Sequence, residues 1–161
     1  MQSRNVYRIP IEEEFIKAVI TEKSPAHIKY TDADGTKYDL TRAIDYLCDE
    51  GTSVHAVYEG EVVKIQNKVN KTYPLKDFKN IPIEERDGNY IMIKHPNNEF
   101  SIYSHLSEIS VKKGERVKKG DIIGKSGNTG PSRSPHLHFM VFLFNEPYPS
   151  RDLTSLEITW E

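Results

Sequence analysis

The segment PHLHFMVFLF, residues 135–144, decides the fold of this chain. It is an uninterrupted apolar, β-favouring run that begins with two histidines separated by a single residue. In an extended strand successive side chains alternate between faces, so residues i and i+2 point the same way. His136 and His138 are therefore predicted to face one ion or one substrate atom from the same side of a sheet. The same pair on the solvated face of an edge strand would have no such meaning.

The sequence around this segment predicts a mostly β protein. A loop rich in turn-forming residues, 126–135, leads directly to His136, and loops held by a rigid sheet are where binding groups usually lie. From residue 28 onward, short β-rich runs alternate with glycine, asparagine and proline. This rhythm predicts a single-domain antiparallel β sandwich or barrel-like fold. Residues 10–20 differ, because an early proline, acidic residues and an apolar stripe there predict one short helix.

Length and composition limit the function classes. A chain of 161 residues fits one domain, and its formal net charge of -2 gives no general attraction to nucleic acid or anionic membranes. No apolar run approaches the roughly 20 residues that span a bilayer. The single cysteine, Cys48, excludes an internal disulfide and a thiolate zinc knuckle, and it is predicted to be a small core residue. The N-terminus lacks the apolar stretch of a secretion signal, so the protein is either cytoplasmic or has lost a leader.

Four polar residues in apolar strands carry the candidate chemistry. Asp45 lies within an apolar run, where an unpaired carboxylate would be costly and needs a cation, a metal or hydrogen-bond donors. His105 closes another predicted strand. With His136 and His138 they form a set of one carboxylate and three imidazoles. Such a set can hold zinc through oxygen and nitrogen while leaving other imidazoles free for proton transfer.

Several short motifs occur in order between residues 38 and 144. By these motifs the chain resembles the lysostaphin-type zinc endopeptidases, the LytM or M23 family. The resemblance implies the family's β fold, a duplicated hybrid motif, over residues 38–144 with an insertion at about 66–88, preceded by an N-terminal extension (1–37) with the short helix and followed by a tail (145–161). The matching stretches are TRAID (41–45), GTSV (51–54), YSHL (103–106), a lysine-glycine hairpin (111–124), GNTG (127–130) and PHLHF (135–139).

The resemblance also implies roles for individual residues. Asp45 and His138 would be zinc ligands, while His105 and His136 would flank the nucleophilic water and the developing oxyanion. The implied substrates are peptide bonds of bacterial cell-wall peptidoglycan, and the implied location is periplasmic or extracellular. We also predict a groove walled by loops 66–88 and 126–135. Its predicted substrate contacts are Tyr103, Asn128 and Arg133, although Tyr103 also fits a core position and Arg133 also fits a solvated surface position.

One departure from the family pattern leaves the metal site open. The family places its first zinc-binding histidine four residues before the aspartate, where this chain has Thr41, and a threonine hydroxyl is a poor substitute for imidazole. A catalytic zinc normally has three protein ligands. Another side chain could complete the site, and His27 is the first candidate because a preceding strand could lie next to Asp45. The other candidates are Asp34, Asp39 and His55.

Other functions remain open at this stage. Zinc could be weak or absent, leaving a degenerate domain that binds peptide or regulates another cell-wall hydrolase, or a different metal could bind with a water-rich shell. The hairpin at 117–124 also resembles biotinyl and lipoyl domains and sugar-phosphotransferase phosphocarriers. No lysine has the setting that biotinyl or lipoyl attachment requires. A phosphocarrier would use His105 and His136 but leave Asp45 unexplained. Of the remaining histidines, His55 is predicted to be an exposed strand residue and His95 to mark a turn; the sequence does not indicate the oligomeric state.

Overall fold

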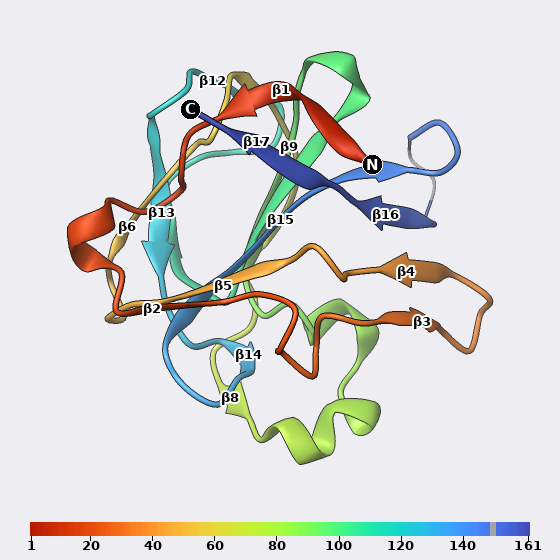
Figure 1. The fold of residues 1–161 in the computed structure, drawn as a ribbon. Coiled ribbons are helices and arrows are strands. Elements are labelled where there is room, and N and C mark those ends of the chain that lie inside the picture. The colour runs from red at the N-terminus through yellow and green to blue at the C-terminus, as the bar shows by residue number, and fades with distance from the viewer. Residues whose placement is uncertain (149–150) are drawn as a thin grey trace.

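A computed structural model of the chain describes residues 1–148 and 151–161, and it is built mostly of strands, as predicted (Figure 1). Residues 149–150 of the predicted tail lie outside the described residues. The strands are β1 (Gln2–Tyr7), β2 (Ala18–Ile20), β3 (Lys29–Thr31), β4 (Lys37–Asp39), β5 (Ile44–Leu47), β6 (Ser53–His55), β7 (Gly60–Gln66), β8 (Thr72–Tyr73), β9 (Tyr90–Lys94), β10 (Phe100–Ser104), β11 (Leu106–Ile109), β12 (Arg116–Val117), β13 (Ile122–Ser126), β14 (Gly130–Pro131), β15 (His136–Phe144), β16 (Leu153–Ser155) and β17 (Glu157–Trp160). The 3₁₀ helices are η1 (Glu13–Phe15), η2 (Leu75–Asn80), η3 (Ile83–Glu85) and η4 (Pro96–Asn98).

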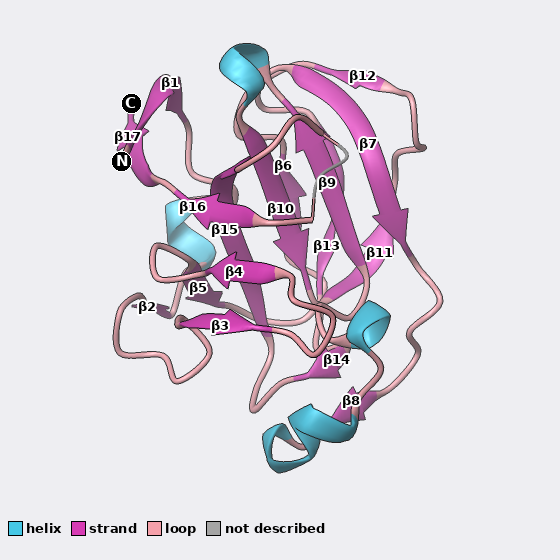
Figure 2. Cartoon of the chain, turned by 90° about the vertical axis from the view of Figure 1, so that its right-hand side faces the viewer, coloured by secondary structure: helices cyan, strands magenta, loops and turns pink. Residues whose placement is uncertain are grey.

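Strand β15 is the centre of the large sheet, and it contains the two histidines. The strand order of this sheet is β12-β7-β9-β10-β15-β16-β4-β3. The antiparallel strands β7, β9, β10 and β15 lie side by side in Figure 2. On its other edge, the first half of β15 pairs with β5, and β5 in turn pairs with β2. The second half of that edge pairs with β16. Every residue of β15 therefore pairs with a neighbouring strand on at least one edge.

The main core lies between this sheet and a smaller sheet of order β11-β13-β6. From β15 the core receives Leu137, Phe139 and Val141, which alternate along the strand, and the smaller sheet contributes Val54 and Ile123. All five side chains are fully buried. Two sheets packed face to face over an apolar layer form the predicted sandwich.

The opposite face of β15 is also covered, which explains why its sequence is apolar without alternation. Met140 and Phe142 point into a second apolar cluster with Phe100 and Ile102 of β10. His136 and His138 precede these residues with the same spacing of two, so they lie on this second face. The two histidines therefore occupy the end of a face whose other end is buried apolar packing.

The predicted helix over residues 10–20 is wrong. The structure has only the single turn η1 and then the edge strand β2, which pairs with β5. Phe15 and Val19, two members of the predicted apolar stripe, are each 52% exposed, and only Ile11 is fully buried. Pairing with a strand distant in sequence overrides the local helical pattern, because each ladder hydrogen bond satisfies a backbone group.

The two predicted groove walls are joined to each other. Strand β8 in the 66–88 segment and β14 in the 126–135 segment form a short parallel pair. Close to it, the Cα of Gly88 lies so near Thr129 that a Cβ on Gly88 would be 2.2 Å from the Thr129 carbonyl oxygen. Gly88 also has a φ of 59°, which favours glycine. The loops are therefore one packed unit at the end of β15 where the histidines lie.

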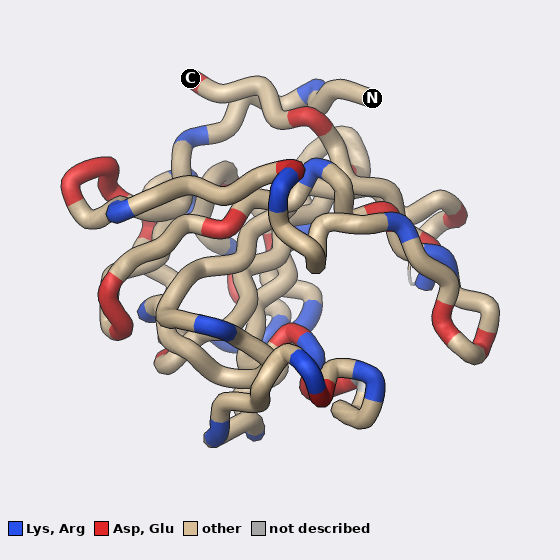
Figure 3. The backbone as a smooth tube through the Cα atoms, turned by 60° about the horizontal axis from the view of Figure 1, so that its bottom comes forward, with Lys and Arg blue, Asp and Glu red and all other residues tan. Residues whose placement is uncertain are grey.

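The opposite end of the molecule is closed by the chain termini. There β1 pairs in parallel with β17, far from the β8–β14 pair (Figures 1 and 2). Lysine and arginine alternate with aspartate and glutamate along the backbone, without a face of one sign in the view of Figure 3. Within the described residues, no helix has the length and apolarity required to cross a membrane.

Candidate active site

Strands β5 and β15 bring three of the predicted site residues together. Asp45 lies directly opposite His138 in the antiparallel register, and opposite residues share a face of the sheet. The Nδ1 atom of His138 is 2.8 Å from Oδ1 of Asp45. Nε2 of His136 lies 4.0 Å from the same oxygen. The spacing of two residues in the HLH segment therefore places both imidazoles around one carboxylate.

His27 completes the cluster from outside the HLH strand. It follows β2 in a turn, where its amide donates to the Ser24 carbonyl at 3.1 Å. Its Nδ1 donates to the carbonyl of Thr21 at 2.6 Å, which leaves Nε2 as the free ring nitrogen. That Nε2 lies 3.2 Å from Oδ1 of Asp45, and the His27 side chain is fully buried. The chain thus places an imidazole next to Asp45 by way of its N-terminal segment.

The donor set of His27, Asp45 and His138 fits a zinc ion. One ligand atom from each of the three lies within 4.8 Å of the others. Ligands at about 2.0–2.1 Å in a tetrahedral zinc site are themselves about 3.3 Å apart, close to the separations of 2.8 Å and 3.2 Å measured from the Asp45 oxygen. Two imidazoles and one carboxylate also match the ligand types of catalytic zinc sites, which keep a fourth position open.

The electrostatics of the cluster favour a negative carboxylate that attracts cations. Burial alone would raise the pKa of Asp45, but hydrogen bonds from His138 and His27 outweigh it and hold this pKa well below its usual range. Burial alone would lower the pKa of His138, but the hydrogen bond to Asp45 and the charges of Asp45 and Asp87 raise it overall. Asp45 is therefore ionised at neutral pH and concentrates negative charge where the two imidazoles meet.

His105 and His136 are held differently, each by a backbone carbonyl of the 126–135 loop. Nδ1 of His105 donates to the Thr129 carbonyl at 2.7 Å, and Nδ1 of His136 donates to the Ser134 carbonyl at 2.8 Å. Each bond assigns the ring proton to Nδ1 and leaves the lone pair on Nε2. Burial, together with the neighbouring imidazoles, lowers the pKa of His105 to about 3, and burial also lowers the pKa of His136. Both rings are neutral at pH 7 and can accept a proton.

The backbone at His105 is in an unusual conformation. Its φ is 63°, in the left-handed region that bulky residues rarely adopt. Backbone hydrogen bonds hold it there, from the His105 amide to the Asp87 carbonyl and from the Leu106 amide to the Asn89 carbonyl, each 2.9 Å. The ring of His105 lies with its centroid 4.7 Å from that of His136. Local strain of this kind is characteristic of functional sites.

The other candidate metal ligands lie elsewhere. The Thr41 hydroxyl donates to Oδ1 of Asp39 at 2.6 Å, so both groups are engaged with each other. Asp39 also pairs with Lys29, at 3.1 Å. Asp34 pairs with Arg151 at 2.7 Å.

The two remaining histidines lie away from the cluster. His55 is not an exposed strand residue, because its side chain is only 12% exposed and its Nδ1 bonds to the Gly120 carbonyl. His95 marks the turn between β9 and β10, as predicted, and its ring is buried, with its nitrogens bonded to the Glu59 carbonyl and the Ser101 hydroxyl. Both rings have structural partners away from the cluster.

The three predicted substrate contacts occupy different environments. Tyr103 is fully buried, and its hydroxyl accepts from the Val57 amide at 3.0 Å, so it belongs to the core. The carbonyl of Asn128 accepts a hydrogen bond from the Thr72 hydroxyl and so links the two loops. Arg133 is exposed on the loop three residues before His136. Of the three, Arg133 has the side chain most accessible to a substrate.

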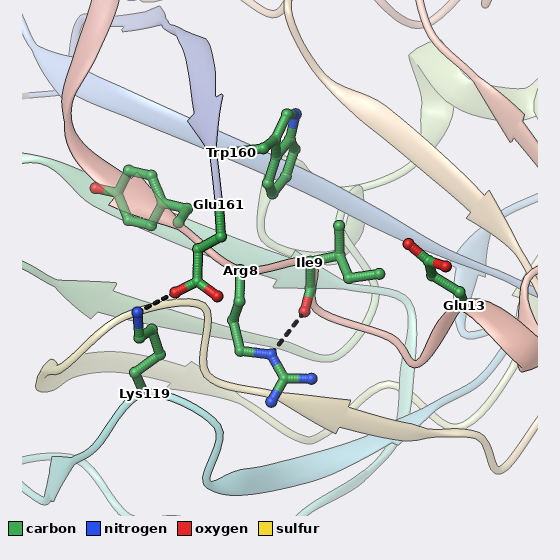
Figure 4. A pocket seen from close by; sticks show the side chains of 7 residues that line it. Arg8, Ile9, Glu13, Lys119, Trp160 and Glu161 are labelled. Atoms are coloured by element: carbon green, nitrogen blue, oxygen red, sulfur yellow. Dashed lines mark hydrogen bonds and ion pairs between the residues drawn. The ribbon is translucent and has the colours of Figure 1, made fainter.

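A separate cavity lies at the other end of the molecule, next to the termini (Figure 4). Its volume is about 410 Å³, and three of its charged side chains are paired or bonded. Lys119 pairs with Glu161, while Arg8 donates to the Ile9 carbonyl at 3.1 Å and pairs with Glu12 at 2.7 Å. The carboxylate of Glu13 also lines the cavity, which shares no residue with the histidine cluster.

Sequence reasoning missed the groups that hold His105 and His136. The carbonyls of Thr129 and Ser134 orient the two rings, and backbone atoms leave no signal in residue type. Asp87, whose carbonyl holds the His105 amide, also went unnoticed. An aspartate immediately before Gly88-Asn89 reads as an ordinary turn residue.

Comparison with known proteins supports the resemblance to the M23 family. The model of Peptidase family M23 matches residues 39–148. Peptidoglycan DD-endopeptidase ShyA of Vibrio cholerae is 37% identical over 103 residues, which cover 64% of this chain and 20% of ShyA. The chain therefore spans about a fifth of the length of this curated relative.

Two solved structures have the same fold. The catalytic domain of lysostaphin from Staphylococcus simulans superposes with a TM-score of 0.53 and 28% identity, covering 80% of each chain. A zinc-containing peptidase from Vibrio cholerae superposes with a TM-score of 0.63 and 22% identity over 94% of this chain and 39% of that chain, a likeness of fold alone. The family match includes the strand of Asp45, the strand of His136 and His138, and the loops 66–88 and 126–135. This chain therefore belongs to peptidase family M23.

Proposed function

We propose that this chain is a zinc-dependent endopeptidase that hydrolyses peptide bonds of bacterial cell-wall peptidoglycan. The observation that carries the proposal is the convergence of His27, Asp45 and His138 on one point, beside two neutral imidazoles. The similarity to ShyA, a peptidoglycan DD-endopeptidase, supports the substrate class.

The proposed ligands are Nε2 of His27, Oδ1 of Asp45 and Nδ1 of His138. Zinc, when bound, supplies a Lewis acid that polarises a carbonyl and lowers the pKa of water toward about 7. In this proposal His27 replaces the family's first zinc-binding histidine, whose position is occupied by Thr41 in this chain. Its ring is already oriented by the Thr21 carbonyl, so little conformational freedom is lost when it binds metal.

His136 and His105 are the proposed catalytic residues. Nε2 of His136, 4.0 Å from Asp45 and unprotonated, is placed to accept a proton from the attacking water. The same ring can later give that proton to the leaving amine. His105 is neutral and buried beside it, and its unprotonated Nε2 is proposed to accept a hydrogen bond from the attacking water and so to orient it.

The loops give the proposed groove its walls. Arg133, exposed on the 126–135 loop, is a proposed contact for a carboxylate of the substrate stem peptide. Asn128 is a proposed wall residue whose carbonyl bond to Thr72 holds the two loops together. Tyr103 supports the sheet beneath and is not part of the proposed contact surface.

Metal content and hydrolysis measured on the same preparations test the proposal. Wild-type protein is expected to hold close to one zinc per chain and to release peptides from purified peptidoglycan. His138→Ala is expected to lose both properties. His136→Ala is expected to keep zinc and lose about 10²–10⁴-fold in rate, the usual contribution of a general base. His55→Ala, a matched histidine outside the cluster, is expected to keep both.

The alternatives give different results in the same assays. A degenerate binding domain would bind peptidoglycan, but after metal loading it would hold no zinc and hydrolyse no peptide. Phosphorylation of His105 or His136 by a phosphotransfer partner would show a carrier. Full activity with another divalent metal and none with zinc would contradict the choice of metal.

A further inference from the structure

Asp87 is a half-buried acid that the proposed mechanism does not use. It ends the 66–88 segment, immediately before Gly88 and strand β9. Among the described residues its carboxylate forms no ion pair, and its one side-chain hydrogen bond is a long one of 3.5 Å from the Ser104 hydroxyl. Burial raises the pKa of Asp87. A carboxylate largely withdrawn from water with so little compensation favours a further partner.

The sheet register places this carboxylate next to His138. Ser104, which donates to Asp87, lies directly opposite His138 in the β10–β15 ladder. Directly opposite residues share a face, with Cβ atoms about 5 Å apart. The carboxylate of Asp87 thus lies on the same face as His138, on the side of β15 away from Asp45. The charges interact, because Asp87 raises the pKa of His138 and His138 lowers that of Asp87.

The ring of His138 has one nitrogen left to satisfy. Nδ1 faces Asp45, so a metal bound there leaves the proton on Nε2. No hydrogen bond within residues 1–148 and 151–161 is made by that Nε2. Histidines that bind metal almost always donate their second N–H to a carboxylate, a carbonyl or a water, which fixes the ring and increases its basicity as a ligand.

We propose that Asp87 is a positioning residue that accepts the Nε2 proton of His138 and so fixes this histidine as a metal ligand. The inference rests on the proposed function, because it requires metal at Nδ1. Asp87 would then couple the 66–88 segment to the metal centre twice, through its carboxylate to His138 and through its carbonyl to the amide of His105. A purely structural Asp87 would need only the carbonyl bond and the contact with Ser104.

Zinc affinity of the folded protein distinguishes these two roles. Asp87→Asn keeps the size of the side chain and its backbone bond to His105 but removes the negative acceptor. We expect the zinc dissociation constant, measured by competition with a chromophoric chelator, to rise about 10–100-fold. The visible spectrum of the cobalt-substituted protein is expected to change as well. Asp32→Asn is the matched control, because Asp32 pairs with Arg86 of the same segment at 3.1 Å and is expected to leave both readouts unchanged.

A second measurement needs no variant and covers the case in which Asp87→Asn fails to fold. In zinc-loaded wild-type protein, long-range ¹H–¹⁵N NMR is expected to show a slowly exchanging Nε2 proton on His138. A rapidly exchanging proton would overturn the proposal, as would an Asp87→Asn protein that folds and binds zinc as tightly as wild type. Wild-type protein that binds no zinc would overturn the proposed function along with this inference.

Discussion

Replacing His27 with alanine is the sharpest perturbation of the proposed metal centre. Structural zinc sites with four ligands bind with an apparent free energy of about 10–16 kcal/mol, or about 3 kcal/mol for each ligand. The His27 ring is fully buried and already fixed by the Thr21 carbonyl, so its full share is expected to be lost. That loss corresponds to a zinc dissociation constant weaker by about 100-fold or more.

The assay is competition for zinc between the protein and a chromophoric chelator at pH 7, with the unfolding midpoint of the metal-free protein as a check on folding. Thr41→Ala is the control, because the Thr41 hydroxyl is bonded to Asp39. It is expected to leave zinc affinity unchanged. His27→Ala protein that folds and binds zinc within about threefold of wild type would refute the assignment of His27. Weaker zinc binding by Thr41→Ala would instead assign the third ligand to the family position.

Three further results are expected. Gly88→Ala should destabilise the protein by at least about 1–3 kcal/mol in urea unfolding, because its Cβ would meet the Thr129 carbonyl that holds His105; unchanged stability would contradict the close contact. Burial lowers the pKa of His95 to about 4 from 6.5, so the unfolded chain takes up its proton first. The stability that neutral His95 contributes, about 3 kcal/mol, should be complete above about pH 6.5 and be lost as the pH falls toward 4, with a smaller loss in His95→Gln. Arg133→Ala should raise KM for peptidoglycan fragments several-fold with little change in kcat, whereas a fall in kcat alone would argue against a binding role.

The sequence was most informative where the chemistry depends on short spacing. His136 and His138 must share a face in any strand. Asp45 interrupts an apolar run, so its carboxylate needs a cation, a metal or hydrogen-bond donors. The ordered motifs then indicated the family fold, which spacing alone does not determine. His27 could be named as a candidate ligand, but its position depends on the pairing of β2 with β5, a contact between segments distant in sequence.

The errors share one physical cause. Residues 10–20 have a helical apolar stripe, yet Phe15 and Val19 are exposed, because the chain forms the single turn η1 and then the strand β2 paired with β5. His55 alternates with Val54 and Ala56 in a pattern typical of an exposed strand face, yet its side chain is only 12% exposed and bonds to the Gly120 carbonyl. In each case the deciding partner is remote in the chain, and local propensity is a weak prior against such contacts.

The position of His27 has a practical consequence for the N-terminal boundary chosen when this domain is expressed as a fragment. The family match begins at residue 39, and a gene fragment started there would retain Asp45, His105 and the whole HLH strand. It would nevertheless lack strand β2, which lines the edge of β5, and the imidazole that lies against Asp45. Expression fragments, chimaeras and transplants of this module therefore need to begin upstream of residue 18, because its smallest complete unit is longer than its motifs.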